Sequence, residues 1–305
     1  MDTLIAILAA AIAAGTPLVF AALGELVTEK SGVLNLGVEG MMLVGAVAGF
    51  AATVASGNPW LGVAAGMAAG ATMALIFALL VLQLMANQVA AGLALTLFGV
   101  GLSAFVGKPL ESVALGSQQT WNIPLLAEIP LLGPVLFRHH LLVYLSWVLL
   151  LALSWFLYRS RAGLVLRAVG ESPESAHAIG YRVIAIRYVA TLFGGAMAGL
   201  GGAYLAQFYT PMWVEGLVAG RGWIALALVV FASWRPTRVL LGAYLFGGVT
   251  IAQFFAQGSG LAVPSQLLSS LPYLATIVVL VLISRDASVI RLNAPVSLGR
   301  SYRPD

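Results

Sequence analysis

Long apolar runs separated by short polar breaks dominate the chain. All but the seventh are roughly 16 to 25 residues long, the length that a helix needs to cross a bilayer. We expect nine membrane spans, at residues 4–23, 33–55, 60–84, 88–106, 140–158, 187–207, 222–234, 238–257 and 269–284. The seventh would be a broken helix or a helix that tilts into the next one. The pattern predicts an all-α polytopic membrane protein with a single transmembrane domain over residues 1–305.

The composition supports this class and excludes others. Hydrophobic residues make up 61% of the chain and charged residues 9%, against roughly 25% charged in soluble proteins. There is no cysteine, so we expect no disulfide and no sulfur metal site. The histidines lack metal-binding spacing, no GxxxxGKS or GxxxxGKT motif occurs, and no Lys/Arg cluster is interleaved with aromatics. We therefore expect no enzyme, no metal site and no nucleic-acid partner.

The basic residues predict the orientation. Five arginines lie in the polar segment 159–187, and cytoplasmic loops of membrane proteins are enriched in Lys and Arg. Placing this segment inside puts twelve of the fifteen basic residues in the cytoplasm and leaves Lys108, Arg138 and Arg221 outside. With nine spans, the N-terminus is then outside and the C-terminus is cytoplasmic.

The centre of this polar segment predicts one short helix with clear end signals. Ser172 can cap its start, and Gly180 can end it in the left-handed conformation. It has about two turns, too few to be stable alone in water, and we expect Ala176 and Ile179 on one side of it. Basic cytoplasmic loops are common, but a mere connector needs no capped helix, so we favour a segment that docks on a partner.

The densest polar stretch within the apolar part reads GELVTEKSGVLNLGVEG. Its glycines weaken a regular helix, and Asn35 and Glu39, four residues apart, would share a helix face. A carboxylate in a span costs roughly 2.5–3.5 kcal/mol at the bilayer centre, so we expect Glu39 to face a polar interior, a partner or the interface. A broken segment lining a substrate path and a polar hinge both fit. We favour the two jointly, with Glu25, Glu29 and Lys30 paired at the cytoplasmic rim.

Two polar residues of the fourth span form a further candidate pair. Gln88 and Thr96 are two turns apart and would point the same way. They could line a pore, whereas capping and snorkelling explain most other polar residues near span ends.

Glycines recur every four residues in three of the spans. They are Gly45 and Gly49, then Gly62, Gly66 and Gly70, and finally Gly195 and Gly199. Small residues at this spacing let helix backbones approach closely in lipid. We expect close packing within the chain, with subunit contact as the alternative for some of them.

The predicted outer loop, residues 108–138, contains four prolines, which prevent it from forming another span. It is also apolar in part, so we expect it to lie on the membrane surface or to re-enter the membrane. A plain interfacial lid and a docking surface are equally good interpretations.

Three motifs are similar to those of a known family. They are GELVTEKSGVLNLGVEGMMLVGA, GLVLRAVGESPESAHAIG and GRGWIALALVVFASWRP. Together they resemble ABC importer permeases of the simple-sugar and nucleoside type (the branched-chain amino acid/ribose type). The similarity is greatest to the shorter of the two permeases that accompany basic-membrane-lipoprotein-type binding proteins. The third motif departs at Ala232 and Ser233, where a glycine is expected.

The resemblance implies a non-catalytic permease subunit of an ATP-driven importer in a bacterial inner membrane. The short helix would be a coupling helix that docks on a separate ATPase, which binds ATP and Mg, while this chain binds no cofactor. The implied ATPase-coupling residues are Arg167, Gly170, Glu171, Pro173, Ala176, Ile179 and Gly180. A second, non-identical permease would complete the alternating-access path, and the outer loop would face a periplasmic or lipoprotein substrate-binding protein.

The expected substrate path runs near Asn35, Glu39, Gln88 and Thr96. Few charges lie along it, which favours a neutral solute, and the resemblance suggests a nucleoside or purine-type compound. The alternative is a proton- or sodium-coupled secondary transporter with Glu39 as the coupling residue. Only one carboxylate lies well inside a span, and a capped cytoplasmic helix would have no role in such a carrier.

Overall fold

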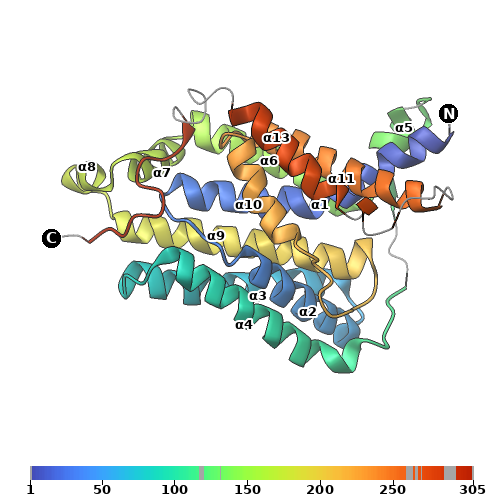
Figure 1. Ribbon diagram of the computed structural model, residues 1–305, viewed down its shortest axis with the longest axis horizontal. Coiled ribbons are helices and arrows are strands. Elements are labelled where there is room, and N and C mark those ends of the chain that lie inside the picture. The colour runs from blue at the N-terminus through green and yellow to red at the C-terminus, as the bar shows by residue number, and fades with distance from the viewer. Residues whose placement is uncertain are drawn as a thin grey trace.

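Each of the nine apolar runs corresponds to a helix in the computed structural model of the protein (Figure 1). The structure describes residues 2–116, 120–130, 132–258, 264, 267, 268, 270–284 and 293–303. The nine helices are α1 (Asp2–Lys30), α2 (Val38–Ser56), α3 (Pro59–Ala78), α4 (Gln88–Gly107), α6 (Leu141–Arg159), α9 (Val183–Tyr204), α10 (Arg221–Phe231), α11 (Pro236–Gly258) and α13 (Leu271–Ser284). α3 and α9 each continue into a π-helical turn, Leu79–Gln83 and Leu205–Tyr209.

Seven helices in the described ranges are long and apolar enough to cross a membrane. The seventh and ninth predicted spans are shorter: α10 has 11 residues and α13 has 14, whereas a full crossing takes about 20. The all-α polytopic architecture is therefore confirmed, and seven of the nine expected spans have spanning length.

The first two predicted spans have different boundaries in the structure. α1 continues past residue 23 to Lys30, because the polar side chains of its last two turns are buried and bonded to other parts of the chain. α2 begins at Val38 rather than at residue 33. Gly32 turns the chain with a φ of +91°, a conformation that favours glycine.

The glycine repeats pack helices within the chain, as expected. A Cβ atom on Gly70 would lie 2.2 Å from the carbonyl oxygen of Gly195, and one on Gly45 would lie 2.4 Å from the Cα of Gly199. Neither approach is possible for a larger residue, so α2, α3 and α9 are in backbone contact.

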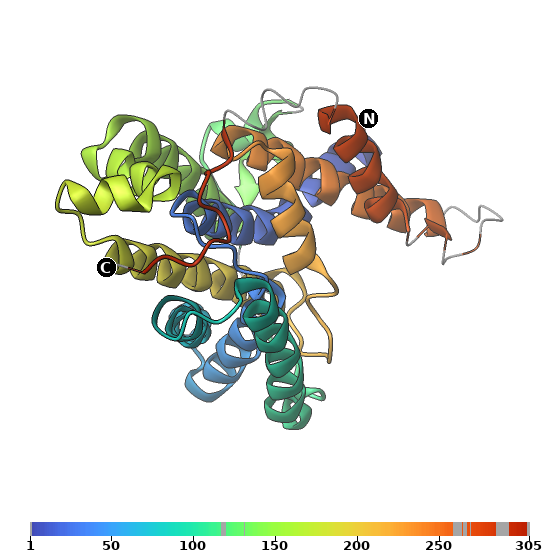
Figure 2. The same ribbon diagram turned by 60° about the vertical axis from the view of Figure 1, so that its left-hand side comes forward.

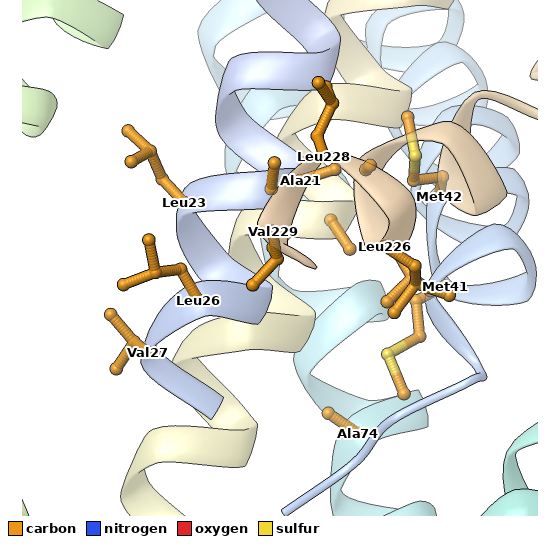
Figure 3. Close-up of a cluster of buried hydrophobic side chains, with 14 of the residues drawn as sticks. Ala21, Leu23, Leu26, Val27, Met41, Met42, Ala74, Leu226, Leu228 and Val229 are labelled. Atoms are coloured by element: carbon orange, nitrogen blue, oxygen red, sulfur yellow. The ribbon is translucent and has the colours of Figure 1, made fainter. Parts of the chain in front are cut away.

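The apolar core forms where α1, α2 and α10 meet. Side chains including Leu26 of α1, Met41 of α2 and Val229 of α10 are buried together (Figure 3). α10 is therefore anchored inside the bundle despite its length.

The two ends of the bundle differ. At one end lie α7 (Arg161–Glu171), α8 (Pro173–Ala178) and the C-terminal residues (Figures 1 and 2). The start of α1 lies at the other end, with α5 (Leu132–Leu136) and the paired strands β1 (Trp121–Asn122) and β2 (Arg138–His139) of the 108–138 loop. The helical elements in the described part of that loop are all short, in agreement with the effect expected of its prolines.

Candidate functional site

The chain between α1 and α2 is not helical, although it is buried. Val33 and Asn35 have no accessible surface. The segment 31–37 runs back from the end of α1 along the bundle to the start of α2 (Figure 1). Non-helical backbone at this depth of a membrane protein must find its hydrogen-bond partners within the protein.

Asn35 is one of the residues that supply those partners. Its side-chain Oδ1 accepts from the N–H of Gly37 at 2.9 Å, just before α2 begins. Its own N–H donates to Oε1 of Glu25 at 3.1 Å. Asn35 and Glu25 therefore fix the break from the two sides, one within the segment and one from α1.

Gln88 and Thr96 of α4 supply the others. Oε1 of Gln88 accepts from the N–H of Leu34 at 2.8 Å, and Oγ1 of Thr96 donates to the carbonyl of Leu36 at 2.9 Å. The two-turn spacing thus does bring both side chains to one face, and that face lies against the broken segment. The structure gathers all four expected path residues around this break, and three of them bind its backbone.

Glu39 is bound by the start of α10. Its two carboxylate oxygens accept from the N–H groups of Gly220 at 2.8 Å and of Gly222 at 2.6 Å. Free N–H groups and the dipole at a helix N-terminus favour an anion. Glu39 was expected to face a polar interior, a partner or the interface. The structure shows the first, because both carboxylate oxygens bind backbone N–H groups inside the protein.

The acidic residues at the end of α1 do not pair at an exposed rim, in contrast to the expectation. Glu25 and Glu29 are each 1% exposed. Glu29 accepts from Nε1 of Trp234 at 2.5 Å, and Lys30 donates to the carbonyl of Asn293 at 2.6 Å. Each side chain thus binds a different segment of the chain, because the helices around α1 leave no open rim there.

The capped short helix is present as α8. The hydroxyl of Ser172 accepts from the N–H of Ser175, and Gly180 follows with a φ of +94°. Pro173 occupies the first helical position. The predicted caps are therefore confirmed.

The two apolar residues of this helix do not share a side. Ala176 is 2% exposed and packs with Val169 and Val183, whereas Ile179 is 73% exposed. The helix has only six residues and ends at Ala178, so Ile179 lies just beyond it and does not continue the face that carries Ala176. Ile179 is thus the residue of this pair that can touch a partner directly.

The remaining predicted coupling residues lie on α7. Gly170 is buried against the end of α1, since a Cβ there would lie 2.2 Å from the carbonyl oxygen of Lys30. The guanidinium of Arg167 lies 5.5 Å from the ring centre of Tyr158, and Glu171 is exposed. Arg167 and Glu171 line a cavity of about 280 Å³ together with Lys30.

One buried charge at this end of the bundle was not predicted from the sequence. Arg187 of α9, which the sequence places among the cytoplasmic basic residues, is only 1% exposed. The sequence feature that could have indicated its burial is its position at the start of an apolar run, the predicted span 187–207. Within the described residues, no group of three or more His, Cys, Asp or Glu side chains is placed to hold a metal ion.

Comparison with known proteins gives one consistent picture. The family model described as a branched-chain amino acid transport system permease component matches residues 7–283. A putative glucose ABC transporter permease protein of Haloferax volcanii is 43% identical, with 97% of each chain covered. A nucleoside ABC transporter permease protein of Lactococcus lactis is 34% identical over 92% of this chain and 93% of its own. A guanosine ABC transporter permease protein of Bacillus subtilis is 32% identical over 94% of this chain and 92% of its own. No solved structure gives a significant match.

Proposed function

Because the chain belongs to the family of branched-chain amino acid transport system permease components, we propose that it forms, with a second permease, the alternating-access path of an ATP-driven importer. Its relatives are permease subunits, so the chain is a non-catalytic, multi-pass membrane subunit. The family match extends over most of residues 1–305, which supports a single permease domain.

The observation that carries the proposal is the meeting of two discontinuous segments at Glu39. The non-helical segment 31–37 leads into α2, and the non-helical segment 210–220 leads into α10. Glu39, in the first turn of α2, binds the first N–H groups of α10. In many secondary transporters, substrates bind where broken helices meet, because helix ends and free backbone groups are available there, and the same physical argument applies to this junction. We place the substrate path beside this junction, near Asn35, Glu39, Gln88 and Thr96.

The same junction accounts for the short α10. The first turn of α10 is bound to Glu39. Trp234, which follows the end of α10, binds Glu29 near the end of α1. The non-helical 210–220 segment would cover the rest of the crossing. This supports nine crossings with the N-terminus outside and the C-terminus cytoplasmic.

The end that carries α7 and α8 would then face a separate ATPase, which binds ATP and Mg. The exposed Ile179 is suited to enter a groove on that partner, and Glu171 is exposed as well. Arg167, Gly170, Pro173, Ala176 and Gly180 would hold the helix in place rather than touch the partner. The 108–138 loop at the opposite end would receive the substrate-binding protein.

We propose a neutral solute of the nucleoside or sugar class as the substrate. Relatives described for guanosine, nucleosides and glucose are all similar over nearly their full length. In Bacillus subtilis and in Haloferax volcanii, a second permease with the same described solute is also similar, at 27% identity in each case. This supports a non-identical second permease. Glu39 already binds two N–H groups, so it needs no charged substrate as a partner.

The test is to purify the tagged chain with its bound partners from its native membrane and to reconstitute the complex in liposomes. We expect co-purification of an ATPase and a second permease. Uptake of labelled guanosine or glucose should need ATP on the ATPase side and should persist when ionophores collapse ion gradients. Uptake by the chain alone, driven by a proton or sodium gradient and abolished in Glu39→Gln, would establish the secondary carrier instead.

A further inference from the structure

A C-terminal strap, residues 293–303, crosses the end of the bundle that carries α7 and α8 (Figure 1). It has almost no regular secondary structure, yet Ser297 is only 5% exposed. The functions proposed above do not use this segment.

The strap hydrogen-bonds α7 on one side. The N–H of Ser297 donates to the carbonyl of Gly170 at 3.0 Å, and the Ser297 hydroxyl donates to the same oxygen at 2.7 Å. Gly170 is the next-to-last residue of α7, directly before the capped α8. The strap is therefore fixed at the base of the exposed helix.

The strap also hydrogen-bonds the break between α1 and α2. The N–H of Gly299 donates to the carbonyl of Gly32 at 3.1 Å. A Cβ on Gly299 would lie 3.9 Å from the Cβ of Leu34. One short stretch of chain thus joins the base of α8 to the segment beside the proposed substrate path.

Arg187 locks these contacts together. Its Nε donates to the carbonyl of Ser31 at 3.1 Å, and its two terminal nitrogens donate to Oγ of Ser297 at 3.0 Å and to the carbonyl of Arg300 at 3.3 Å. Its guanidinium lies 5.8 Å from the ring centre of Tyr302. The planar guanidinium holds the strap and residue 31 at once with donors in a fixed geometry, which the rotatable donors of a lysine do not provide.

The strap reaches α8 itself through Tyr302. The ring of Tyr302 lies 6.3 Å from that of His177 on α8 and also faces the guanidinium of Arg187. The contacts therefore form a continuous path from α8 through the strap and Arg187 to residues 31 and 32.

We propose that the C-terminal strap is a rigid link that carries movement of α7 and α8 to the broken segment 31–37, with Arg187 as its positioning residue. The inference rests on the proposed importer, in which an ATPase moves α8. The strap takes part in coupling and does not merely end the chain.

The first test breaks the link. Ser297→Ala removes the hydroxyl that joins Gly170 to Arg187, and we expect the number of solute molecules transported per ATP hydrolysed to fall roughly tenfold, as for the loss of a hydrogen bond to a charged group. Ser297→Thr keeps the hydroxyl and should restore the ratio. Ser301→Ala, on an exposed residue of the same strap, is the control and should change nothing.

A fold defect is separated from uncoupling by two measurements. Ser297→Ala should still co-purify with its ATPase in wild-type amounts. Its melting temperature should fall slightly, because Arg187 loses one buried acceptor, so the ratio is measured at a temperature at which the variant complex is fully folded. An unchanged ratio in Ser297→Ala would overturn the proposal. A wild-type complex that fails to transport with ATP would overturn the importer itself, which is a different result.

The second test makes the link permanent. The chain has no cysteine, so Leu34→Cys with Gly299→Cys introduces the only thiols, at a Cβ–Cβ separation suited to a disulfide. A rigid link predicts that the oxidised protein transports as well as the reduced one. The Gly299→Cys single variant is the control for strain at this position, where φ is +75°, and the Leu34→Cys single variant is the control for the loss of the leucine side chain. Transport that stops on oxidation and returns on reduction would show that the strap must detach, and would overturn a rigid link.

Discussion

Glu39 shows how backbone N–H groups can accommodate a carboxylate inside an apolar bundle. Both oxygens are bound by backbone N–H groups at the start of α10. These groups would otherwise be unsatisfied, since the first N–H groups of a helix have no partner within it. The charge therefore joins two helices, and this structural role alone accounts for the residue.

Glu39→Gln tests this role. An amide retains one acceptor oxygen but presents an NH₂ group to the other N–H, so one buried donor loses its partner at a cost of about 1–3 kcal/mol. We expect a lower melting temperature of the purified complex and uptake reduced several-fold, still independent of ion gradients. Glu215→Gln, on an exposed acid of the segment before α10, is the matched control.

Abolished uptake in Glu39→Gln with an unchanged melting temperature would contradict a purely structural role. It would instead give the carboxylate a direct part in transport.

Among the helices, α8 shows that a short sequence pattern can predict where a helix starts and ends but not which side of it is buried. Its start and end were predictable from Ser172, Pro173 and Gly180, because caps are local chemistry. The side that faces the protein was not, because Ala176 is covered by Val169 and Val183 from neighbouring elements. A partner on this surface would meet Ile179.

We expect Ile179→Asp to reduce co-purification of the ATPase at least several-fold, because a charge would replace the large apolar side chain exposed at the end of α8. Ala178→Asp places the same charge on the neighbouring exposed position and should have a smaller effect. Ala176→Arg should instead lower the yield of folded protein, since a buried arginine has no room there. Equal loss in the two aspartate variants would mean that charge alone, not the Ile179 side chain, decides the contact.

Helix packing makes a separate prediction. A methyl group on Gly70 would meet the backbone of α9, and such overpacking costs about 1–3 kcal/mol. Gly101 of α4 has open space at its Cβ position, so Gly101→Ala should be neutral or stabilise by up to roughly 1 kcal/mol. Melting temperatures in the same detergent compare the two, and a Gly70→Ala protein as stable as wild type would refute the close contact with Gly195.

Elements that depend on local sequence were predictable, and elements that depend on distant residues were not. The apolar runs and glycine repeats correctly predicted the helices and their close packing, because hydropathy and residue size act at each position. The extension of α1 to Lys30 and the break at 31–37 depend on Gln88, Thr96 and Trp234, which are far away in the sequence. The same holds for Arg187, whose burial comes from a strap more than a hundred residues later.

For the whole molecule, the number of membrane crossings depends on the two short helices, α10 and α13. If α10 and α13 both failed to cross, the C-terminus would still be on the same side, because removing two crossings leaves an odd number. The side of the C-terminus therefore does not decide between seven and nine. The turn between α10 and α11 distinguishes the two counts. It lies in the cytoplasm if α10 crosses the membrane and outside if α10 does not.

Single cysteines in a chain without its own thiols give the decisive labelling experiment. We expect a membrane-impermeant maleimide to label Leu125→Cys, in the 108–138 loop, on intact cells, and to label Thr237→Cys and Ser301→Cys only after permeabilisation. All three side chains are exposed, so access depends on the side of the membrane. Thr237→Cys labelled on intact cells would show that α10 does not complete a crossing. The bond between Trp234 and Glu29 argues against that outcome, because it holds the end of α10 at the same end of the bundle as α7 and α8.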